Sequence, residues 1–364
     1  MRSQYTAIAA WLGALPRDVL VLTFAAGLPF EVKRLAYWPG SRLLDVWRGT
    51  TLIGIRRRGS SVLGPPWPDL VVSASMRNEP VCRWIRRQSG NQTRYVHLGK
   101  PWANVSTFDL VITVPEYRWV PDAPNVQRNA CSLHEVTPER LAEAAKAWAP
   151  SVEALPRPFV AVLVGGYAGP YPFDRETAER LGREASALAR ARGGSLLVTT
   201  SHRTSRAAST ALAGAIDVPC FFHRWERGAN PYFGLLGLAD EIIVTCDSTS
   251  MLAEACATRK PVHVFDLTAT IGGSGWRARL RRCNWDRVKG LLYRNVLLRL
   301  GPDRIKRDIR LVADDLIGAG RAIPLGQPFP KRRQAPFDEM PRTLDRIGQL
   351  LDEREASSSE TYSR

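Results

Sequence analysis

Short runs of apolar residues alternate with amphipathic stretches over most of the chain. The apolar runs are rich in Val, Ile and Leu at consecutive positions, which is typical of strands buried on both faces of a parallel sheet. We predict strands at Val19–Phe24, Leu70–Ser73, Tyr95–Leu98, Leu110–Val114, Phe159–Val164, Leu196–Thr200, Glu241–Thr245 and Val262–Asp266. We predict helices at Glu79–Arg87, Pro138–Trp148, Arg175–Arg190, Thr204–Ala215, Pro231–Ala239 and Ser250–Ala257. This alternation predicts an α/β fold with parallel sheets.

A proline-rich segment, Ala149–Pro158, divides the chain, and the strand–helix pattern restarts after it. The length of 364 residues fits two domains of about 150 residues each. We expect an N-terminal α/β domain at 1–150, a second at 151–330, and a C-terminal helix with a polar, disordered tail at 331–364. Two open α/β domains joined in this way face a cleft, and open sheets bind ligands at the carboxyl ends of their strands.

Composition excludes several classes of protein. No apolar run is long enough for a transmembrane helix, and the N-terminus lacks the pattern of a signal peptide. The six cysteines are far apart and form no C-x-x-C pair, which indicates buried thiols in a reducing compartment. The five histidines have no metal-ligand spacing, and no G-x-S-x-G elbow of a hydrolase is present.

The strongest candidate site follows the predicted strand Glu241–Thr245. A turn of small polar residues there includes Asp247, Ser248 and Ser250, and it leads into a helix through Met251. A helix N-terminus offers unpaired N–H groups and a positive dipole end, which suit a phosphate. Glu254 lies one turn further along the same face, where it could accept hydrogen bonds from a ribose diol. The alternative is an ordinary capped helix with a surface glutamate.

Two further loops follow strands of the same predicted domain. The segment Thr199–Thr204 includes Thr200, Ser201 and Arg203, which suit a diphosphate, although a plain polar loop has the same composition. Gly165 and Gly166 follow another strand and would let the backbone approach a ligand. All three loops leave the carboxyl ends of strands, so we expect them to cluster in one mouth.

The preceding helix opens with Asn230 and Pro231, a cap followed by a proline in the first turn. The polar loop His223–Gly228 before it could hold a base ring, and His223 alone reads as a surface histidine. In the N-terminal half, Asp109, Glu116 and Asp122 are candidate general bases, and each also suits a cap or loop.

The net charge of +16 indicates an anionic partner. More than half of it lies in Arg277–Arg310, with twelve Lys or Arg against three Asp or Glu, interleaved with apolar and aromatic residues. Such a stretch suits an anionic membrane surface, and Arg277, Arg279, Arg281 and Arg282 are its candidate contacts. A solvated basic helix is the alternative. No nucleic-acid-binding motif accompanies the charge, so no nucleic acid is expected as a partner.

Several of these residues also carry a resemblance to a known family. The run Asn230–Asp240, the segment Ile242–Met251 with Glu254, and Lys260-Pro261 resemble the ELM-type mitochondrial fission family. Further similarities are Val164–Gly166, Leu197–Ser201 with Arg203, Phe108–Val111, Pro124–Val126 and Val136–Leu141. Together they cover roughly residues 65 to 270.

The resemblance implies a fold and two functions. Bacterial members of that family are described as nucleoside-diphosphate-sugar enzymes or glycosyltransferases, and the plant member is known as an adaptor for a fission GTPase. The second domain is also similar, more distantly, to that of GT-B glycosyltransferases such as the lipid-linked N-acetylglucosaminyltransferase of peptidoglycan synthesis. The resemblance implies two Rossmann-like domains facing a cleft, with Glu254 in the place of the glutamate that holds the donor ribose.

Two features depart from the family. Its members open with a glycine-containing loop, Asp-Gly-Lys-x-Gly, whereas this chain begins near the Asn-Gln that follows that loop, with Ser3-Gln4. We therefore expect the first strand and loop to be absent. The family also has His-Asp where this chain has Tyr117-Arg118 after Pro115-Glu116. Both departures lie in the half expected to bind the acceptor.

These observations lead to one main expectation. A GT-B-like enzyme would move a sugar from a nucleotide sugar to a lipid-linked or lipopolysaccharide-type acceptor at the cytoplasmic face of the inner membrane. Arg203 and the helix start at Ser248–Ser250 would neutralise the leaving diphosphate without metal or cofactor, and Glu116 is the candidate base. The rival is a non-catalytic adaptor that keeps the fold and docks a membrane or a partner protein.

Overall fold

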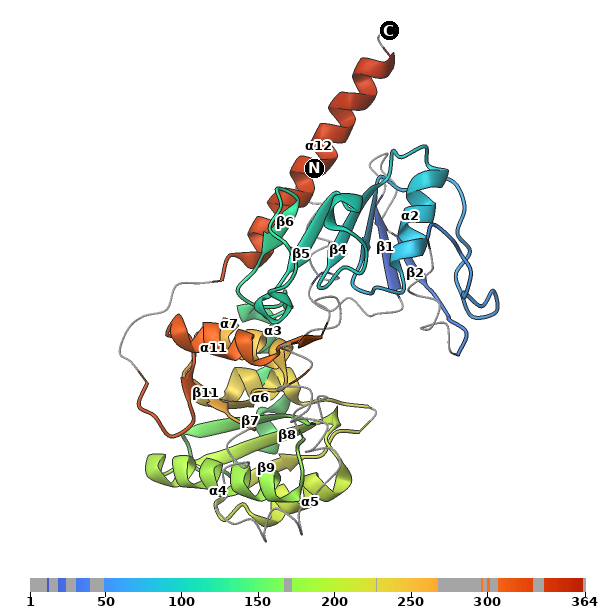
Figure 1. The fold of residues 1–364 in the computed structure, drawn as a ribbon. Coiled ribbons are helices and arrows are strands. Elements are labelled where there is room, and N and C mark those ends of the chain that lie inside the picture. The colour runs from blue at the N-terminus through green and yellow to red at the C-terminus, as the bar shows by residue number, and fades with distance from the viewer. Residues whose placement is uncertain are drawn as a thin grey trace. The chain divides into compact units, whose positions relative to one another are not determined.

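The computed structural model describes residues 12, 19–23, 31–39, 49–166, 172–226, 228–267, 296, 300–301, 307–329 and 337–362, with side chains up to residue 353 in the last segment. The chain forms two compact units (Figure 1). Met1–Glu135 and Asp338–Arg364 make up the first unit, and Val136–Phe337 the second. These bounds differ from the expected ranges 1–150, 151–330 and 331–364, because helix α3 (Pro138–Trp148) groups with the second unit and the C-terminal helix with the first.

The first unit contains one six-stranded sheet in the order β2-β1-β3-β4-β5-β6. The strands are β1 (Val19–Thr23), β2 (Glu31–Arg34), β3 (Leu70–Ser73), β4 (Arg94–Leu98), β5 (Leu110–Thr113) and β6 (Val126–Arg128). Strands β3 to β6 are parallel, as expected. Strand β1 is antiparallel to both of its neighbours, which corrects the expectation of a fully parallel sheet.

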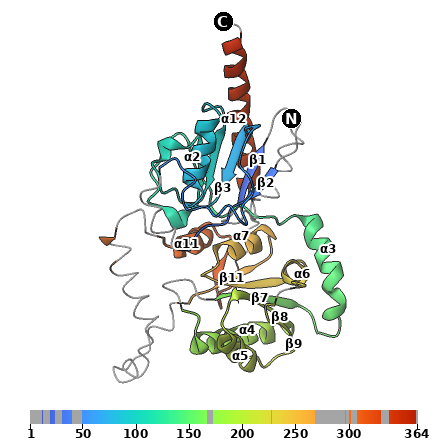
Figure 2. The same cartoon turned by 90° about the vertical axis from the view of Figure 1, so that its right-hand side faces the viewer.

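Alternation along the strands divides the first core between two helices. Helix α2 (Glu79–Gln88) packs on the face that carries Leu20 and Val71. Helix α12 (Glu339–Tyr362) packs on the opposite face, which carries Val21 and Val72. The chain therefore returns from the second unit to complete the first (Figures 1 and 2).

The polar tail from Glu353, expected to be disordered, continues α12 as a helix to Tyr362. Packing of Ile347, Leu350 and Leu351 against the sheet fixes the preceding turns, so extending the helix requires no new nucleation.

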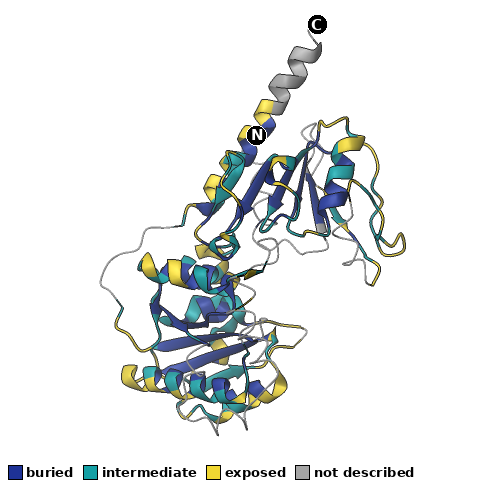
Figure 3. Cartoon of the chain, in the orientation of Figure 1, coloured by how far each residue is buried: buried dark blue, intermediate teal, exposed yellow. Residues whose placement is uncertain are grey.

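The second unit contains a fully parallel sheet in the order β12-β11-β10-β7-β8-β9. Its strands are β7 (Phe159–Gly166), β8 (Ser195–Arg203), β9 (Cys220–His223), β10 (Glu241–Thr245), β11 (Val262–Phe265) and β12 (Ile323–Pro324). The helices are α3, α4 (Arg175–Arg192), α5 (Arg206–Gly214), α6 (Tyr232–Leu238), α7 (Thr249–Ala257) and α11 (Arg310–Gly318). This is the strand order of a doubly wound Rossmann sheet, which places a reversal of direction between β7 and β10. The central strands β7 and β10 are coloured as buried in Figure 3, as expected for strands in the middle of a sheet with helices on both faces.

All predicted strands and helices form, with small shifts at their ends, and the α/β class with two Rossmann-like sheets is confirmed. Strands β2, β6, β9 and β12 were not predicted. Each is short and lies at or beside the edge of its sheet, so it is buried on too few sides to need a continuous apolar run. None of the described helices combines the length and hydropathy that a bilayer crossing requires.

Two glycines bring helix α6 into close contact with α3. A β-carbon at Gly234 would lie 2.6 Å from the Trp148 ring, and one at Gly237 would lie 2.5 Å from the carbonyl oxygen of Leu141. The ammonium group of Lys260 then donates to the carbonyl oxygens of Leu236 and Gly237, 2.7 Å from each, and caps the C-terminal end of α6. Lys260, one of the residues that carry the family resemblance, thus has a structural role here.

We expect Gly234→Ala to destabilise the second unit by about 1–3 kcal/mol, because the added methyl group would also lie 2.9 Å from Trp148 Cβ, a contact that rotation of the ring does not relieve. The matched control is Gly214→Ala in α5, where nothing lies within 4 Å of the added carbon. That change should leave stability unchanged or raise it by up to about 1 kcal/mol, since alanine favours the helix. Urea unfolding monitored by circular dichroism measures both. Equal midpoints for the two variants would contradict the close packing.

Candidate functional site

The candidate site lies at the carboxyl edge of the second sheet, where strand order reverses. Chain direction turns outward from β7 toward β8 and β9 on one side and from β10 toward β11 and β12 on the other. Crevices at such reversals are where open α/β sheets bind ligands. The three loops singled out in the sequence leave β7, β8 and β10, which are adjacent strands, so they do gather at one edge.

Side chains from all three loops interlock around Gly165. Its N–H donates to Thr245 Oγ1 at 2.9 Å, and its carbonyl oxygen accepts from the hydroxyls of Ser201 and Thr204. A β-carbon at Gly165 would lie 2.2 Å from Asp247 Oδ2, so the carboxylate of Asp247 fills the space that a side chain would occupy. Glycine is required at this position by contacts within the protein itself.

Position 166 also requires glycine, but for a different reason. Its φ of 126° is a conformation that residues with a side chain rarely adopt. A β-carbon there would also lie 2.4 Å from the backbone oxygen of Arg203. The glycine pair therefore allows β7 and the end of β8 to approach each other.

Asp247 and Arg203 form an ion pair at the centre of the site, with Arg203 Nη1 3.1 Å from Asp247 Oδ2. The Asp247 side chain is fully covered, whereas 28% of the Arg203 side chain is exposed. Neither carboxylate oxygen accepts a hydrogen bond of normal geometry from the described residues. Burial raises the pKa of Asp247 to about 6, although the positive charge of Arg203 acts in the opposite direction. Asp247 can thus influence a ligand only through Arg203, which reaches solvent.

The hydroxyl groups of the β8 loop are already engaged. Ser201 Oγ accepts from the N–H of Arg203 at 3.2 Å as well as binding Gly165, and Thr200 Oγ1 accepts from the N–H of Trp225 at 2.9 Å. Both residues are buried. In this loop, the guanidinium of Arg203 therefore carries a positive charge that reaches solvent and can still bind an anion.

Helix α7 begins directly after Asp247. Ser248 is its N-cap residue by position, yet its side chain makes no capping bond. The N–H groups of the first turn, which includes Ser250 and Met251, have no partner within the helix itself. Ser250 is exposed and Met251 is half-buried, so this first turn faces accessible space.

Glu254 lies in the following turn of α7, where Tyr232 of α6 donates its hydroxyl proton to Oε2. Burial raises the pKa of Glu254, although the Tyr232 hydrogen bond and the positive charge of Arg140 oppose that effect. Asn230 is exposed, and its Oδ1 accepts from the N–H of Tyr232 at 3.1 Å, which caps the start of α6. The Tyr232 bond was not foreseen from sequence, because the two residues lie 22 positions apart.

One aromatic residue at this edge was named in the sequence only as part of a loop. Trp225 follows β9 and is 41% exposed, although its backbone is held by Thr200. Its ring lies edge-on to that of His202, with 5.9 Å between centroids. An exposed indole of this kind is a suitable surface for stacking a base.

The three candidate bases named in the sequence all lie in the first unit. Asp109 is bound by Arg86 and Arg94, at 3.3 and 3.2 Å, and accepts the N–H of Tyr95 at 2.8 Å. Asp122 pairs with Arg128 at 2.6 Å. Glu116 is buried in a short 3-10 helix, Pro115–Tyr117, at the carboxyl end of β5.

A second buried carboxylate was missed in the sequence. Glu79, the first residue of α2, is 1% exposed and accepts the N–H groups of Trp102 and Ala103 at 2.7 and 3.0 Å. It holds the loop after β4 against α2. A glutamate at a helix start gives no sign of this role in sequence, since surface glutamates favour the same position.

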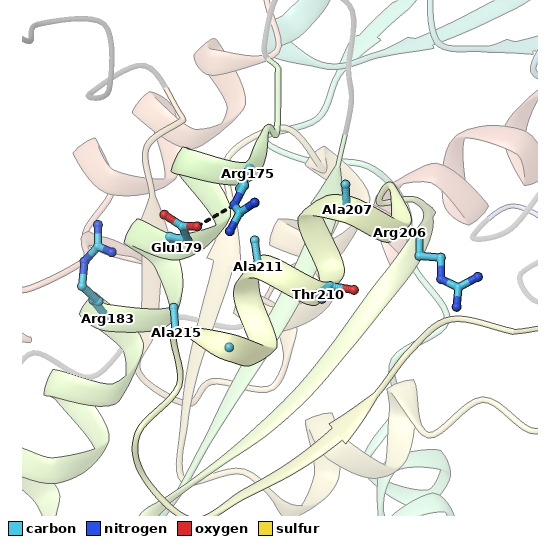
Figure 4. Close-up of a pocket in the computed structure, with 9 residues that line it drawn as sticks. Arg175, Glu179, Arg183, Arg206, Ala207, Thr210, Ala211 and Ala215 are labelled. Carbon is cyan, nitrogen blue, oxygen red and sulfur yellow. Dashed lines mark hydrogen bonds and ion pairs between the residues drawn. The ribbon is translucent and has the colours of Figure 1, made fainter.

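Other regions do not add to this site. Arg277, Arg279, Arg281 and Arg282 lie outside the described residues. An open cavity of about 930 Å³ between α4 and α5 is lined by Arg175, Glu179, Arg183 and Arg206, and Arg175 is paired with Glu179 at 2.9 Å (Figure 4). None of the residues predicted to bind a donor lines it. Among the described residues, no three His, Cys, Asp or Glu side chains gather to hold a metal ion.

The buried Asp247 gives stability a characteristic pH dependence. Its folded pKa of about 6 exceeds its ordinary value of 3.8, so the folded chain holds more protons between these values and its stability falls as pH rises through them. The loss should total roughly 2–3 kcal/mol. Asp247→Asn should remove this slope, as measured by urea unfolding at pH 4 to 7. An unchanged slope in the variant would assign the effect to other carboxylates.

Comparison with solved structures finds glycosyl- or sugar-phosphate-related enzymes of weak similarity. A glycosyltransferase from Rickettsia africae ESF-5 is 11% identical, with 79% of this chain and 77% of that one covered and a TM-score of 0.40. A UDP-forming α,α-trehalose-phosphate synthase from Burkholderia xenovorans, solved with glucose-6-phosphate, is 12% identical with a TM-score of 0.31, covering 64% and 69%. Phytolacca americana UGT2, solved with UDP-2fluoro-glucose and pterostilbene, is 12% identical with a TM-score of 0.26, covering 72% and 55%. Scores this low do not establish a common arrangement of the whole chain.

Comparison of sequences establishes the family of this chain. The "Mitochondrial fission protein ELM1" of Arabidopsis thaliana is 27% identical over an alignment of 219 residues, and the match covers 54% of this chain and 51% of the plant protein. The chain thus spans about half the length of the curated relative that it matches. The model of the family described as Mitochondrial fission ELM1 matches residues 1–282, which include β1 to β11 and every described residue of the candidate site. The protein therefore belongs to the Mitochondrial fission ELM1 family.

Proposed function

We propose that this protein is a GT-B-like glycosyltransferase that takes a sugar from a nucleotide sugar. The observation that carries the proposal is the combination, at the strand-order reversal of a Rossmann sheet, of a partly exposed arginine with an uncapped helix N-terminus. Both favour a diphosphate, and they come from loops that are locked to each other through Gly165.

In this mechanism Arg203 and the first turn of α7 neutralise the diphosphate as the bond to the sugar breaks. That charge stabilisation supplies what a metal ion supplies in other transferases, so no metal or cofactor is needed. Glu254 would accept hydrogen bonds from the ribose, with Tyr232 fixing its orientation. Trp225 would stack on the base, and Asn230 lies before the helix that carries Tyr232.

The acceptor would be a lipid-linked glycan or a lipopolysaccharide precursor, met at the cytoplasmic face of the membrane. The basic stretch Arg277–Arg310 supports this part, because its charge and aromatic residues suit anionic headgroups. Glu116, which lies at the carboxyl end of β5, is the candidate base.

An adaptor without catalysis is the second candidate. Two observations favour it: the relative from Arabidopsis is named a mitochondrial fission protein, and Glu116 is buried. An adaptor would keep the fold and the basic stretch and would have no affinity for a donor. Donor binding therefore separates the two candidates.

A nucleoside diphosphate should bind without metal and lose about 1.5–3 kcal/mol of binding free energy in Arg203→Gln, the range for a hydrogen bond to a charged group. Because that change alone leaves Asp247 buried without a countercharge, the double variant Arg203→Gln/Asp247→Asn serves as a folded second case. Isothermal calorimetry with UDP and GDP in the presence of EDTA measures the loss.

Arg157→Gln is the matched control. Arg157 pairs with Asp240 at 2.8 Å at the amino end of β7, so its loss should leave nucleotide affinity unchanged. Absence of nucleotide binding by the unaltered chain would favour the adaptor, and equal losses in both arginine variants would remove Arg203 from the site.

Glu254→Gln should weaken ribonucleotides but not their 2′-deoxy forms. The unaltered chain should prefer the ribonucleotide about tenfold, the worth of one good hydrogen bond, and the variant should lose most of that preference. Tyr232→Phe, which frees Oε2 of Glu254 from its hydrogen bond, should reduce the preference in part. Competition calorimetry with matched nucleotide pairs tests both. If ribo and deoxy forms lose affinity alike, Glu254 does not bind the ribose.

A further inference from the structure

An open apolar groove of about 540 Å³ lies in the first unit, remote in sequence from every residue of the candidate site. Six aliphatic side chains line it: Leu35, Leu52, Ile53, Ile55, Val62 and Leu63. Its volume is in the range of small-molecule sites. Leu35 belongs to the core around α2, and Leu52, Ile55 and Leu63 pack against that core, so the floor of the groove is rigid.

The rim of the groove exposes aliphatic surface. Ile53 is 66% exposed and Val62 84% exposed, and the neighbouring Trp38 is 59% exposed. The backbone N–H of Trp38 donates to the carbonyl oxygen of Gly54 at 3.0 Å, which holds the indole segment beside Ile53. Large apolar side chains concentrated in this way mark an interaction surface. The loops beside β2 and α2 are coloured as exposed or intermediate in Figure 3.

The hydroxyl groups around the groove do not make its interior polar. Ser60 Oγ donates to the carbonyl oxygen of Arg56 at 2.6 Å and accepts from the N–H of Ala36 at 2.8 Å. Ser61 Oγ accepts from the N–H of Arg34 at 3.0 Å. Because these hydroxyls satisfy the backbone, the groove offers an occupant mainly hydrocarbon.

Positive charge lies at one side of the groove. Arg57 lines it, and Arg56 and Arg58 flank Arg57 in the chain, all three exposed. Within the described part of the chain, none of the three has a carboxylate partner. Three unneutralised guanidinium groups next to a hydrocarbon groove match a ligand that has an anionic head and an apolar chain.

We infer that this groove docks the first unit on a membrane by taking an acyl chain of an anionic phospholipid, whose phosphate meets Arg56–Arg58. The inference shares membrane association with the proposed function but does not depend on donor binding. It places a membrane contact in the first unit, in addition to the one proposed for Arg277–Arg310.

The test is sedimentation of the full chain with vesicles of phosphatidylcholine alone or mixed with phosphatidylglycerol. Changing Arg56, Arg57 and Arg58 to Gln should weaken binding to the anionic vesicles about fivefold for each arginine, or about a hundredfold together, at low salt. Changing Ile53 and Val62 to Ser should weaken it at least tenfold, because buried aliphatic surface is lost. These side chains are exposed, so neither change should affect folding.

Matched controls use exposed residues elsewhere. Arg183, Arg224 and Arg259 changed to Gln remove the same charge from the second unit, and Met76→Ser removes an exposed apolar side chain from the first. Both control variants, the triple arginine variant and Met76→Ser, should sediment as the unaltered chain does. If the Arg56–Arg58 variant binds no worse than the Arg183, Arg224 and Arg259 control, general charge explains the binding and the groove is excluded.

Two further arms separate the explanations. Glycerol 3-phosphate should not compete with vesicles, whereas dihexanoyl phosphatidylglycerol below its micellar concentration should; competition by both alike would mean an anion site without a chain. Loss of binding in Arg279, Arg281 and Arg282 changed to Glu, with none in the groove variants, would also overturn the inference. If the chain binds vesicles through the groove but binds no nucleotide, the inference about the groove is supported and the proposed donor site is rejected.

Discussion

The buried carboxylate of Asp247 is the constraint on which the candidate site depends. It fills the space above Gly165, and its charge is balanced by Arg203 from the neighbouring loop. A carboxylate without exposed surface is costly unless it is paired, so this contact keeps the ends of β7, β8 and β10 together. The same ion pair decides which charged group is accessible to solvent. Part of the Arg203 guanidinium is exposed, whereas the Asp247 carboxylate is fully covered.

The polar loops of the candidate site mainly hold one another in place. Most of the hydroxyls that look like ligand donors in the sequence are used to join one loop to the next, as Thr245, Ser201 and Thr200 show. What remains for a ligand is a small set of groups held in fixed positions: one guanidinium, the first turn of α7 and the carboxylate of Glu254. Preorganised groups of this kind stabilise developing charge without rearranging, which is the property that a metal-free transferase needs.

Much of the fold could be predicted from the sequence, because strands such as β7 and β10 are buried on both faces and therefore have continuous apolar runs. The direction of β1 could not be predicted, since a strand covered by α2 on one face and α12 on the other has the same apolar pattern in either direction. The gathering of three loops was predictable from their positions after adjacent strands. The roles of Asp247, Tyr232 and Glu79 were not, because each depends on a contact with a residue far away in the chain.

The distribution of charge bears on both candidate functions. At the candidate site the charge of Arg203 is balanced by Asp247, so that site adds little to the net charge of +16. The unbalanced charge lies elsewhere, in Arg277–Arg310 and in the exposed run Arg56–Arg58. An extended anionic surface would suit charge placed in this way, and both the proposed transferase and the proposed adaptor would meet such a surface. Charge therefore does not distinguish the two functions. The distinction depends on whether a diphosphate binds the exposed edge of the Arg203 guanidinium while Asp247 stays paired, since only a transferase requires a bound donor.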